Sequence, residues 1–307
     1  MPTERQTVAT QAGLASDKKP GYDGGESSIG KSAESPGPVM SSGSSRTALI
    51  SSAIGRLSHG VGRWGRHGLN LLFPPRCAYC DAELCHPGDD DLLMCDRCRG
   101  ALGPDDWAYC LRCGAQASPG EPAPESCDMC RSTRLKFDTV VSLGAYRSEL
   151  GRAVLRMKQP AGDLLSAAIG RLYRLRRGAD LAALSPDVVV PVPMFWARRL
   201  ARGTNSPDIL AECLARHLSV PLVQGMLVRC RNTLPQASLK PGPRFANVRQ
   251  AFRLRAGYDF EGMRVVLVDD ILTTGATASE IAGLLKRAGA SLVAVAVAAR
   301  GVGDRSF

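Results

Sequence analysis

Apolar residues are spaced in two different ways along the second half of the chain. Short continuous apolar runs are typical of strands buried on both faces of a parallel sheet, and spacings of three and four residues are typical of amphipathic helices. The expected strands are 139–145, 187–192, 221–228, 265–268 and 291–299, and the expected helices are 148–157, 163–176, 206–217 and 278–287. Strands that alternate with helices predict an α/β domain with a largely parallel, doubly wound sheet.

The first half of the chain has weaker patterning. Residues 1–45 are rich in Ser, Gly, Pro, Lys and Glu and have almost no apolar clusters, so we expect them to be disordered. Residues 46–73 show helical apolar spacing interrupted by glycines, which predicts a short amphipathic helical lead-in. We therefore expect a cysteine-rich module over 74–134 and the α/β domain over 135–307.

Cysteines occur in four Cys-x-x-Cys pairs, Cys77/Cys80, Cys95/Cys98, Cys110/Cys113 and Cys127/Cys130. One such pair presents two thiolates to an ion, and two pairs complete a closed tetrahedral site. Soft thiolates in this geometry suit Zn²⁺, so we expect two structural zinc ions. Disulfides and an iron–sulfur cluster are the alternatives, and Cys85 or His86 could replace a zinc ligand.

Composition narrows the location and the partners. A formal net charge of +10 over 307 residues suits polyanionic partners, either phosphorylated substrates or nucleic acid. No apolar run is long enough to cross a membrane, and the start of the chain lacks a signal-peptide pattern. Many cysteines without a secretory signal indicate a reducing compartment, so we expect a cytoplasmic protein without membrane insertion. A thiol redox protein is a weaker alternative.

The stretch Val265–Thr277 carries the most specific chemistry. Its apolar run is followed by Asp269 and Asp270 and then by the turn Thr273-Thr274-Gly275-Ala276-Thr277, which opens a helix. Ligands bind at the carboxyl ends of parallel strands, and hydroxyls beside helix N–H groups bind anions. Carboxylates suit sugar hydroxyls or a hydrated metal ion. The stretch therefore predicts a site for phosphate beside ribose, with an ordinary strand–helix turn capped by Thr273 or Thr274 as the alternative.

Two other segments suit a phosphorylated ligand. The strand end at 187–194 is followed by Arg198, Arg199 and Arg202, and guanidinium groups bind polyphosphates in a bidentate manner. An exposed basic helix is the alternative for the first two. The long polar segment 229–252 predicts a lid or hood over the site, with a plain surface loop as the alternative.

These motifs together resemble a known family. The run from Asp269 to Thr277 looks like the phosphoribosyl-pyrophosphate (PRPP) motif of type I phosphoribosyltransferases. The order of motifs is similar to that of the ComF family, and the pieces that match are Phe73–Cys80, Pro191–Pro193, Arg202–Asn205, Arg231–Gln236 and Asp269–Thr277. The match covers about residues 70–300. The resemblance implies a type I phosphoribosyltransferase-like α/β domain preceded by a small double zinc-ribbon domain.

The resemblance also implies roles for individual residues. PRPP would lie with its 5-phosphate in Thr273, Thr274, Gly275, Ala276 and Thr277 and with its ribose hydroxyls on Asp269 and Asp270, while Mg²⁺ bridges pyrophosphate and ribose oxygens. The residues expected on the pyrophosphate side are Val192, Pro193, Arg198 and Arg202, and those of the hood loop are Arg231, Gln236, Arg244 and Asn247. The catalytic candidates are Arg202, Asp269 and Asp270.

Two functions follow as hypotheses. The first is a ComF-like phosphoribosyltransferase, a pentosyltransferase that acts at the ribose anomeric carbon and is linked to DNA uptake and competence. The alternative is a non-enzymatic adaptor whose zinc ribbons contact single-stranded DNA or a DNA-uptake helicase; a homodimer is an assembly we consider for either. The chain departs from the family pattern at Gln159-Pro160, which follow Lys158, at Met194–Trp196, and at Thr204 and Ser206. These departures leave the acceptor substrate open.

Overall fold

The computed structural model describes residues 74–84, 92–104, 107–117, 124–234, 239 and 242–301. All of these belong to one compact unit, residues 62–307. The expected disordered start 1–45 and the lead-in 46–73 lie outside the described residues. Cys85, His86 and Gln236 lie outside them as well.

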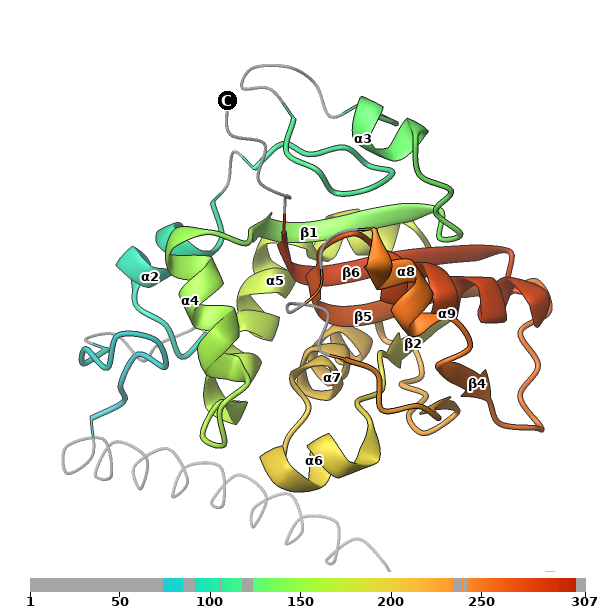
Figure 1. Ribbon diagram of the computed structural model, residues 1–307. Coiled ribbons are helices and arrows are strands. Elements are labelled where there is room, and N and C mark those ends of the chain that lie inside the picture. The colour runs from blue at the N-terminus through green and yellow to red at the C-terminus, as the bar shows by residue number, and fades with distance from the viewer. Residues whose placement is uncertain are drawn as a thin grey trace, which may run out of the picture. The chain divides into compact units, whose positions relative to one another are not determined.

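A parallel four-stranded sheet forms the centre of the described fold (Figure 1). Its strands are β1 (Thr139–Ala145), β2 (Val188–Pro191), β5 (Arg264–Leu272) and β6 (Leu292–Arg300). The spatial order is β1-β6-β5-β2, and every neighbouring pair is parallel. The predicted α/β class with a parallel sheet is confirmed.

Helices cover both faces of this sheet. The long helices are α4 (Ser148–Met157), α5 (Asp163–Ala183), α7 (Ser206–Leu218) and α9 (Ala276–Arg287). Successive strand residues point to opposite faces, so Val266 and Val268 of β5 pack in the core cluster that includes α4, α5 and α7. Val265 and Leu267 pack in the other cluster, with α9. Such two-sided burial explains why the strands are apolar without alternation.

Two short helices and a second sheet lie between β2 and β5. They are α6 (Trp196–Arg202), α8 (Pro243–Val248), and the antiparallel strands β3 (Leu227–Arg229) and β4 (Phe252–Leu254). The expected strand at 221–228 was too long, because Leu222 makes only an isolated bridge to Val189. The segment predicted as a hood therefore begins at the end of β3, contains the short helix α8, and ends at the start of β4, the strand that pairs with β3.

The end of β5 differs from the expectation. The strand continues through Asp269 and Asp270, because its pairing with β6 persists to Leu272. The carboxylates thus lie in the last residues of the strand rather than after it. Helix α9 begins at Ala276, and its N-cap is Gly275 in a left-handed conformation (φ +80°) rather than Thr273 or Thr274. Glycine adopts this backbone without strain, so it ends the turn.

The cysteine-rich part contains two similar units. The first ribbon, the described residues between 74 and 104, has an Arg76–Glu83 bridge and helix α2 (Asp96–Leu102). The second ribbon, the described residues between 107 and 134, has a Tyr109–Gln116 bridge and helix α3 (Asp128–Arg131). Each unit therefore repeats a tight turn followed by a short helix. Among the described helices, none is long and apolar enough to span a membrane.

Candidate functional site

The eight predicted zinc-ligand cysteines gather into two groups of four. The first group is Cys77, Cys80, Cys95 and Cys98, and the second is Cys110, Cys113, Cys127 and Cys130; within each, the ligand atoms lie within 4.8 Å of one another. Measured Sγ–Sγ separations are 3.7 Å for Cys80–Cys95 and 3.5 Å for Cys113–Cys127. A tetrahedron with Zn–S bonds of about 2.3 Å has edges of roughly 3.8 Å. Both groups therefore fit structural zinc.

Disulfides do not explain these cysteines. All eight are free thiols, and their separations are well beyond a disulfide bond of about 2.05 Å. The two groups are closed four-thiolate sets, which leave no open position for a substrate. We therefore expect the metal ions to contribute to folding, as structural zinc does in small modules.

The carboxylate pair, Asp269 and Asp270, lies at the carboxyl edge of the central sheet. The Asp270 backbone N–H donates to Asp269 Oδ1 at 2.8 Å. Burial, together with the neighbouring charge of Asp270, raises the pKa of Asp269 to about 8. Asp270 instead forms an ion pair with Lys158 Nζ at 3.1 Å. Burial thus favours the protonated form of Asp269, whereas Asp270 has Lys158 as an ion-pair partner.

Lys158 was not predicted as a site residue. It follows the last residue of α4, and its charge lowers the pKa of Asp269 in addition to pairing with Asp270. No sequence pattern relates it to a carboxylate pair so far along the chain. Only the packing of α4 near the edge of β5 brings the ammonium group there.

Two arginines from different segments meet near Thr233, and one of them, Arg229, lies close enough to Asp269 for their charges to interact. Arg198 of α6 donates to the Thr233 carbonyl at 2.6 Å, and Arg229 at the end of β3 donates to the Thr233 hydroxyl. Arg229 also lies over the Phe252 ring, 5.4 Å from its centroid. Burial and the charge of Arg198 lower the pKa of Arg229, whereas Asp269 opposes that shift. Arg229 is a second site residue that sequence reasoning missed.

The turn Thr273–Thr277, hereafter the phosphate loop, joins β5 to α9. The Thr274 hydroxyl accepts from the Ala276 N–H at 3.4 Å. The N-cap residue, Gly275, has no side chain that could accept a hydrogen bond from the first turn of this twelve-residue helix. Helix N–H groups beside threonine hydroxyls provide donors for an anion. The arrangement has the chemistry expected of a phosphate site.

The remaining predicted residues divide into those near the carboxylate pair and those away from it. Val192 lies near the carboxylate pair, because its N–H donates to the carbonyl of Val268, the residue before Asp269, at 2.8 Å. Asn205 donates to the Val192 carbonyl at 3.4 Å. Pro193 lies next to it and lines a smaller pocket beside Arg229. Arg202 is exposed and has no hydrogen bond or ion pair to the described residues.

The predicted hood residues mainly hold the loop itself. Arg231 donates to the Arg249 carbonyl at 2.7 Å, and Asn247 exchanges hydrogen bonds with the Leu234 backbone at 3.2 and 3.0 Å. Arg244 Nε donates to the Leu239 carbonyl at 3.0 Å. These contacts fold the segment between β3 and β4.

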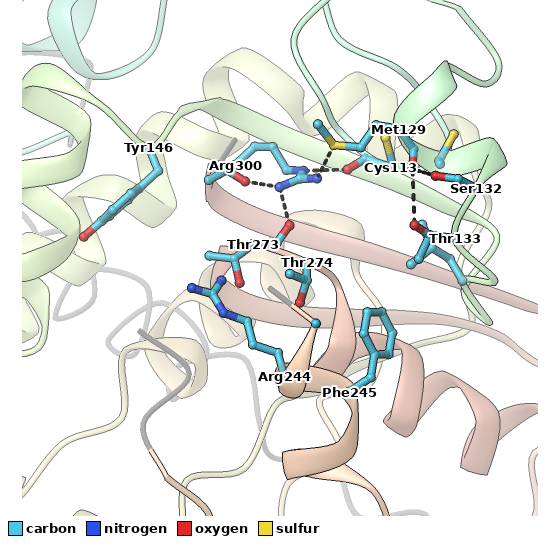
Figure 2. Close-up of a pocket in the computed structure, with 14 residues that line it drawn as sticks. Cys113, Met129, Ser132, Thr133, Tyr146, Arg244, Phe245, Thr273, Thr274 and Arg300 are labelled. Atoms are coloured by element: carbon cyan, nitrogen blue, oxygen red, sulfur yellow. Dashed lines mark hydrogen bonds between the residues drawn. The ribbon is translucent and has the colours of Figure 1, made fainter. Parts of the chain in front are cut away.

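A cavity of about 500 Å³ lies beside the phosphate loop (Figure 2). Thr273 and Thr274 form its floor, and Arg244 and Phe245 approach from α8. The opposite wall comes from the second ribbon and from the end of β6; its residues include Cys113, Met129, Ser132, Thr133 and Arg300. The hood, the phosphate loop and the second ribbon therefore share one cavity.

Two family patterns match this chain. Residues 209–306 match the phosphoribosyl transferase domain, which includes the carboxylate pair and the phosphate loop. Residues 68–131 match the double zinc ribbon domain, which includes all eight cysteines of the two groups. The two matches lie in the order that the motifs indicated.

Curated relatives match over most of their length. Competence protein F of Haemophilus influenzae is 29% identical over 230 residues, covering 73% of this chain and 96% of that protein. DNA utilization protein YhgH of Escherichia coli O157:H7 is 31% identical over 218 residues, covering 66% and 94%. Competence protein ComFC of Bacillus subtilis is 28% identical over 194 residues, covering 61% and 75%.

Proposed function

Because this chain belongs to the ComF family, in which a double zinc ribbon precedes a phosphoribosyltransferase domain, we propose that it is a phosphoribosyltransferase. It binds PRPP with Mg²⁺ and transfers or exchanges a group at the ribose anomeric carbon. The names of its relatives, which refer to competence and DNA utilization, support a role in DNA uptake. A cytoplasmic location is part of this proposal.

One observation carries this proposal. Two carboxylates end a buried parallel strand, and three residues later a threonine-rich loop opens a helix at the same edge of the sheet. Ribose hydroxyls donate to carboxylates, whereas a phosphate accepts from helix N–H groups and hydroxyls. The spacing between the two groups suits one ribose 5-phosphate.

The chain's own residues provide binding and charge. The carboxylate pair accepts hydrogen bonds from the ribose 2- and 3-hydroxyls, and the phosphate loop holds the 5-phosphate. Arg229 interacts with the charge of Asp269, and Arg198 lies beside Arg229, so the positive charge of the two arginines would favour the departing pyrophosphate. Bound together with PRPP, Mg²⁺ would be held near Asp269 and Asp270 and would supply positive charge that favours loss of pyrophosphate. The C1–oxygen bond breaks, the acceptor forms the new bond, and positioning provides most of the rate gain.

The cavity beside the phosphate loop is the space we assign to the acceptor. Phe245 offers an aromatic face and Thr273 and Thr274 offer hydroxyls, while a volume of about 500 Å³ accommodates a small planar molecule. A screen of PRPP turnover against bases, amines and ammonia would identify it.

Calorimetry with PRPP and Mg²⁺ tests the proposal. The wild-type chain should bind, and Asp270→Asn should weaken binding by at least ~10-fold, because it removes a charge that the ribose and metal require. Asp163→Asn, on an exposed residue in the first turn of α5, is the matched control and should bind like wild type. No binding by wild type, or equal binding by Asp270→Asn, would overturn the proposal.

A second candidate function, a DNA-binding adaptor, is favoured by a different surface. No residue of α6 is buried, Trp196 and Leu200 are 68% and 81% exposed, and Arg202 is unpaired among the described residues. Residues 213–258 contain no Asp or Glu. Exposed aromatic rings beside arginines suit single-stranded nucleic acid.

The ribbons are a less suitable DNA surface than the sequence indicated. Arg76 and Arg131 are paired at the surface with Asp81 and Asp128, whose negative charges offset them, and Arg112 donates to the Leu135 carbonyl. A gel shift with single-stranded DNA at two salt concentrations separates the surfaces. Trp196→Ala with Arg202→Ala should weaken binding, whereas Arg97→Ala on the exposed face of the first ribbon should not. The reverse result would place the DNA on the ribbons.

A further inference from the structure

Arg300, the last residue of β6, is a buried cation in the wall of the cavity described above. It is only 4% exposed, and its guanidinium group reaches two parts of the chain at once (Figure 2). Its Nε donates to the carbonyl of Cys113, a ligand of the second zinc group, at 2.7 Å. One terminal nitrogen donates to the Leu272 carbonyl at 3.0 Å and also to the carbonyl of Thr273, the first residue of the phosphate loop. The same guanidinium therefore joins the knuckle to the loop.

The other terminal nitrogen and a nearby arginine extend this connection. Arg300 Nη2 contacts Met129 Sδ at 3.5 Å, between two ligands of the second group. Arg112, which lies between the other two ligands, donates to the Leu135 carbonyl at 2.7 Å and also to the Phe137 carbonyl. The second ribbon is thus tied to residues that leave it toward β1.

Those residues support the phosphate loop from behind. A Cβ placed on Gly275 would lie 3.2 Å from Leu135 Cδ2 and 3.3 Å from the Phe137 ring. The Lys136 N–H donates to the Ser279 hydroxyl in the first turn of α9 at 3.1 Å. Backbone of the loop and first turn of α9 therefore rest directly on the segment held by Arg112, and any shift of that segment moves the loop.

We propose that Arg300 is a positioning residue that couples the second zinc group to the phosphate loop. An arginine remains charged in proteins, so a buried guanidinium needs all of its acceptors. When the second knuckle loses its metal, the Cys113 carbonyl moves away, Nε loses its partner, and water enters beside the Leu272 and Thr273 carbonyls. The loop then loses the geometry in which its N–H groups converge. The expected loss of PRPP affinity rests on the proposed function, whereas the expected loss of order in the phosphate loop does not.

The first ribbon lacks such a connection within the described residues. It contacts the α/β domain through Tyr79, whose hydroxyl donates to the Glu149 carbonyl of α4 at 3.3 Å, and through Arg156, which donates to the Tyr79 carbonyl. Arg156 is therefore a matched control for Arg300: each arginine joins one ribbon to the α/β domain, and only one of them also bonds to the phosphate loop.

Hydrogen exchange and calorimetry on the zinc-loaded full chain test the coupling. Arg300→Met should increase amide exchange in residues 272–277 by ~10-fold or more and weaken PRPP binding by a similar factor. Arg300→Lys, which keeps the charge but reaches fewer acceptors, should give an intermediate effect on both. Arg156→Met should leave both at wild-type values.

The outcomes are separable. If Arg300→Met does not fold, the graded result with Arg300→Lys decides the matter. Unchanged loop exchange in Arg300→Lys and Arg300→Met, or an equal increase in Arg156→Met, would overturn the coupling. If wild type fails to bind PRPP while its loop exchange still depends on Arg300, the proposed function fails and the coupling stands.

Discussion

The two ribbons share a knuckle pattern but differ in what surrounds them. Cys80 of the first ribbon is exposed, and Met94 and Leu102 of that ribbon pack into the same core cluster as α4 and α5. In the second ribbon the cysteines form a small cluster of their own, beside Arg300 and the phosphate loop. Equal local chemistry thus has different consequences, because a structural metal matters for function only where its knuckle supports functional backbone.

The largest expected effect separates the two zinc groups. Cys127→Ser should remove the second zinc, disorder the second ribbon and abolish PRPP binding, because zinc supplies much of the folding free energy of such a small module. Cys80→Ser should remove one zinc as well but leave PRPP binding within about threefold of wild type, since its ribbon packs on α4. Metal analysis and calorimetry measure both. Equal loss of PRPP binding in the two variants would contradict the comparison.

The next largest effect concerns Lys158, at the end of α4, the helix that contacts the first ribbon. Lys158→Met removes the partner of Asp270 and a charge that lowers the pKa of Asp269. That pKa should therefore rise, and PRPP affinity at pH 7 should fall by about tenfold, as expected for a shift of one pKa unit. Calorimetry across pH measures the shift, with Arg156→Met on the same helix as control. An unchanged midpoint would remove Lys158 from the site.

A third test asks whether pH acts at the carboxylate pair rather than at the ribbons. Burial and the charge of Asp270 raise the pKa of Asp269 to about 8 from an ordinary value of 3.8. Binding of Mg²⁺ and PRPP needs the ionised form of Asp269. The affinity should therefore increase about tenfold for each pH unit below the pKa and level off above it, between pH 6 and pH 9. Binding below the pKa should release one proton. Calorimetry in buffers of different ionisation enthalpy detects that proton. Asp269→Asn should abolish the slope.

Asp269 should affect the free energy of unfolding in the opposite direction: as pH rises, PRPP affinity increases but the stability of the fold decreases. Because the folded pKa is raised, the folded chain binds this proton more tightly than the unfolded chain does. The resulting stabilisation is complete below about pH 4 and is lost as pH rises through the folded pKa of about 8. Asp269→Asn should therefore be relatively more stable than wild type at pH 9, as measured by urea unfolding.

The smallest effect concerns the contact between the first ribbon and α4. Tyr79 donates to Glu149, and burial together with that carboxylate raises the pKa of Tyr79 to about 12. Tyr79→Phe should cost about 1 kcal/mol of unfolding free energy, the typical value of one hydrogen bond, without changing PRPP affinity. Urea unfolding measures the cost. A change in affinity would show that the first ribbon also acts on the site.

Much of the fold could be predicted from local patterns. Apolar runs predicted the parallel strands, and helix spacing predicted α4, α5, α7 and α9, since side-chain periodicity is set within each element. Ends were less accurate: helix α5 extends to Ala183, beyond the expected Arg176, and β5 includes the carboxylate pair. Element ends depend on packing and pairing with neighbours, which no local pattern records.

The candidate site was only partly predictable. Asp269, Asp270 and the phosphate loop are contiguous, so one stretch of sequence presented them together. Arg198 lies beside Arg229, whereas Arg202 is exposed at the end of α6, and the pyrophosphate-side role expected of both stays a prediction. Arg198 and Arg202 are four residues apart and so lie on similar sides of α6. They differ in exposure because Thr233 packs near Arg198, whereas Arg202 lies at the exposed end of the helix.

The sequence by itself determined the chemistry that depends on short spacing. The Cys-x-x-Cys pairs define two four-thiolate sites, and an apolar run ending in two carboxylates and a threonine-rich turn defines a ribose-phosphate motif. Only the tertiary structure decided that Lys158 and Arg229 lie near the carboxylates and that Arg300 joins the second ribbon to the loop. The reason is physical: contacts between residues far apart in the chain depend on how whole elements pack, and the residues themselves carry no local sign of their partners.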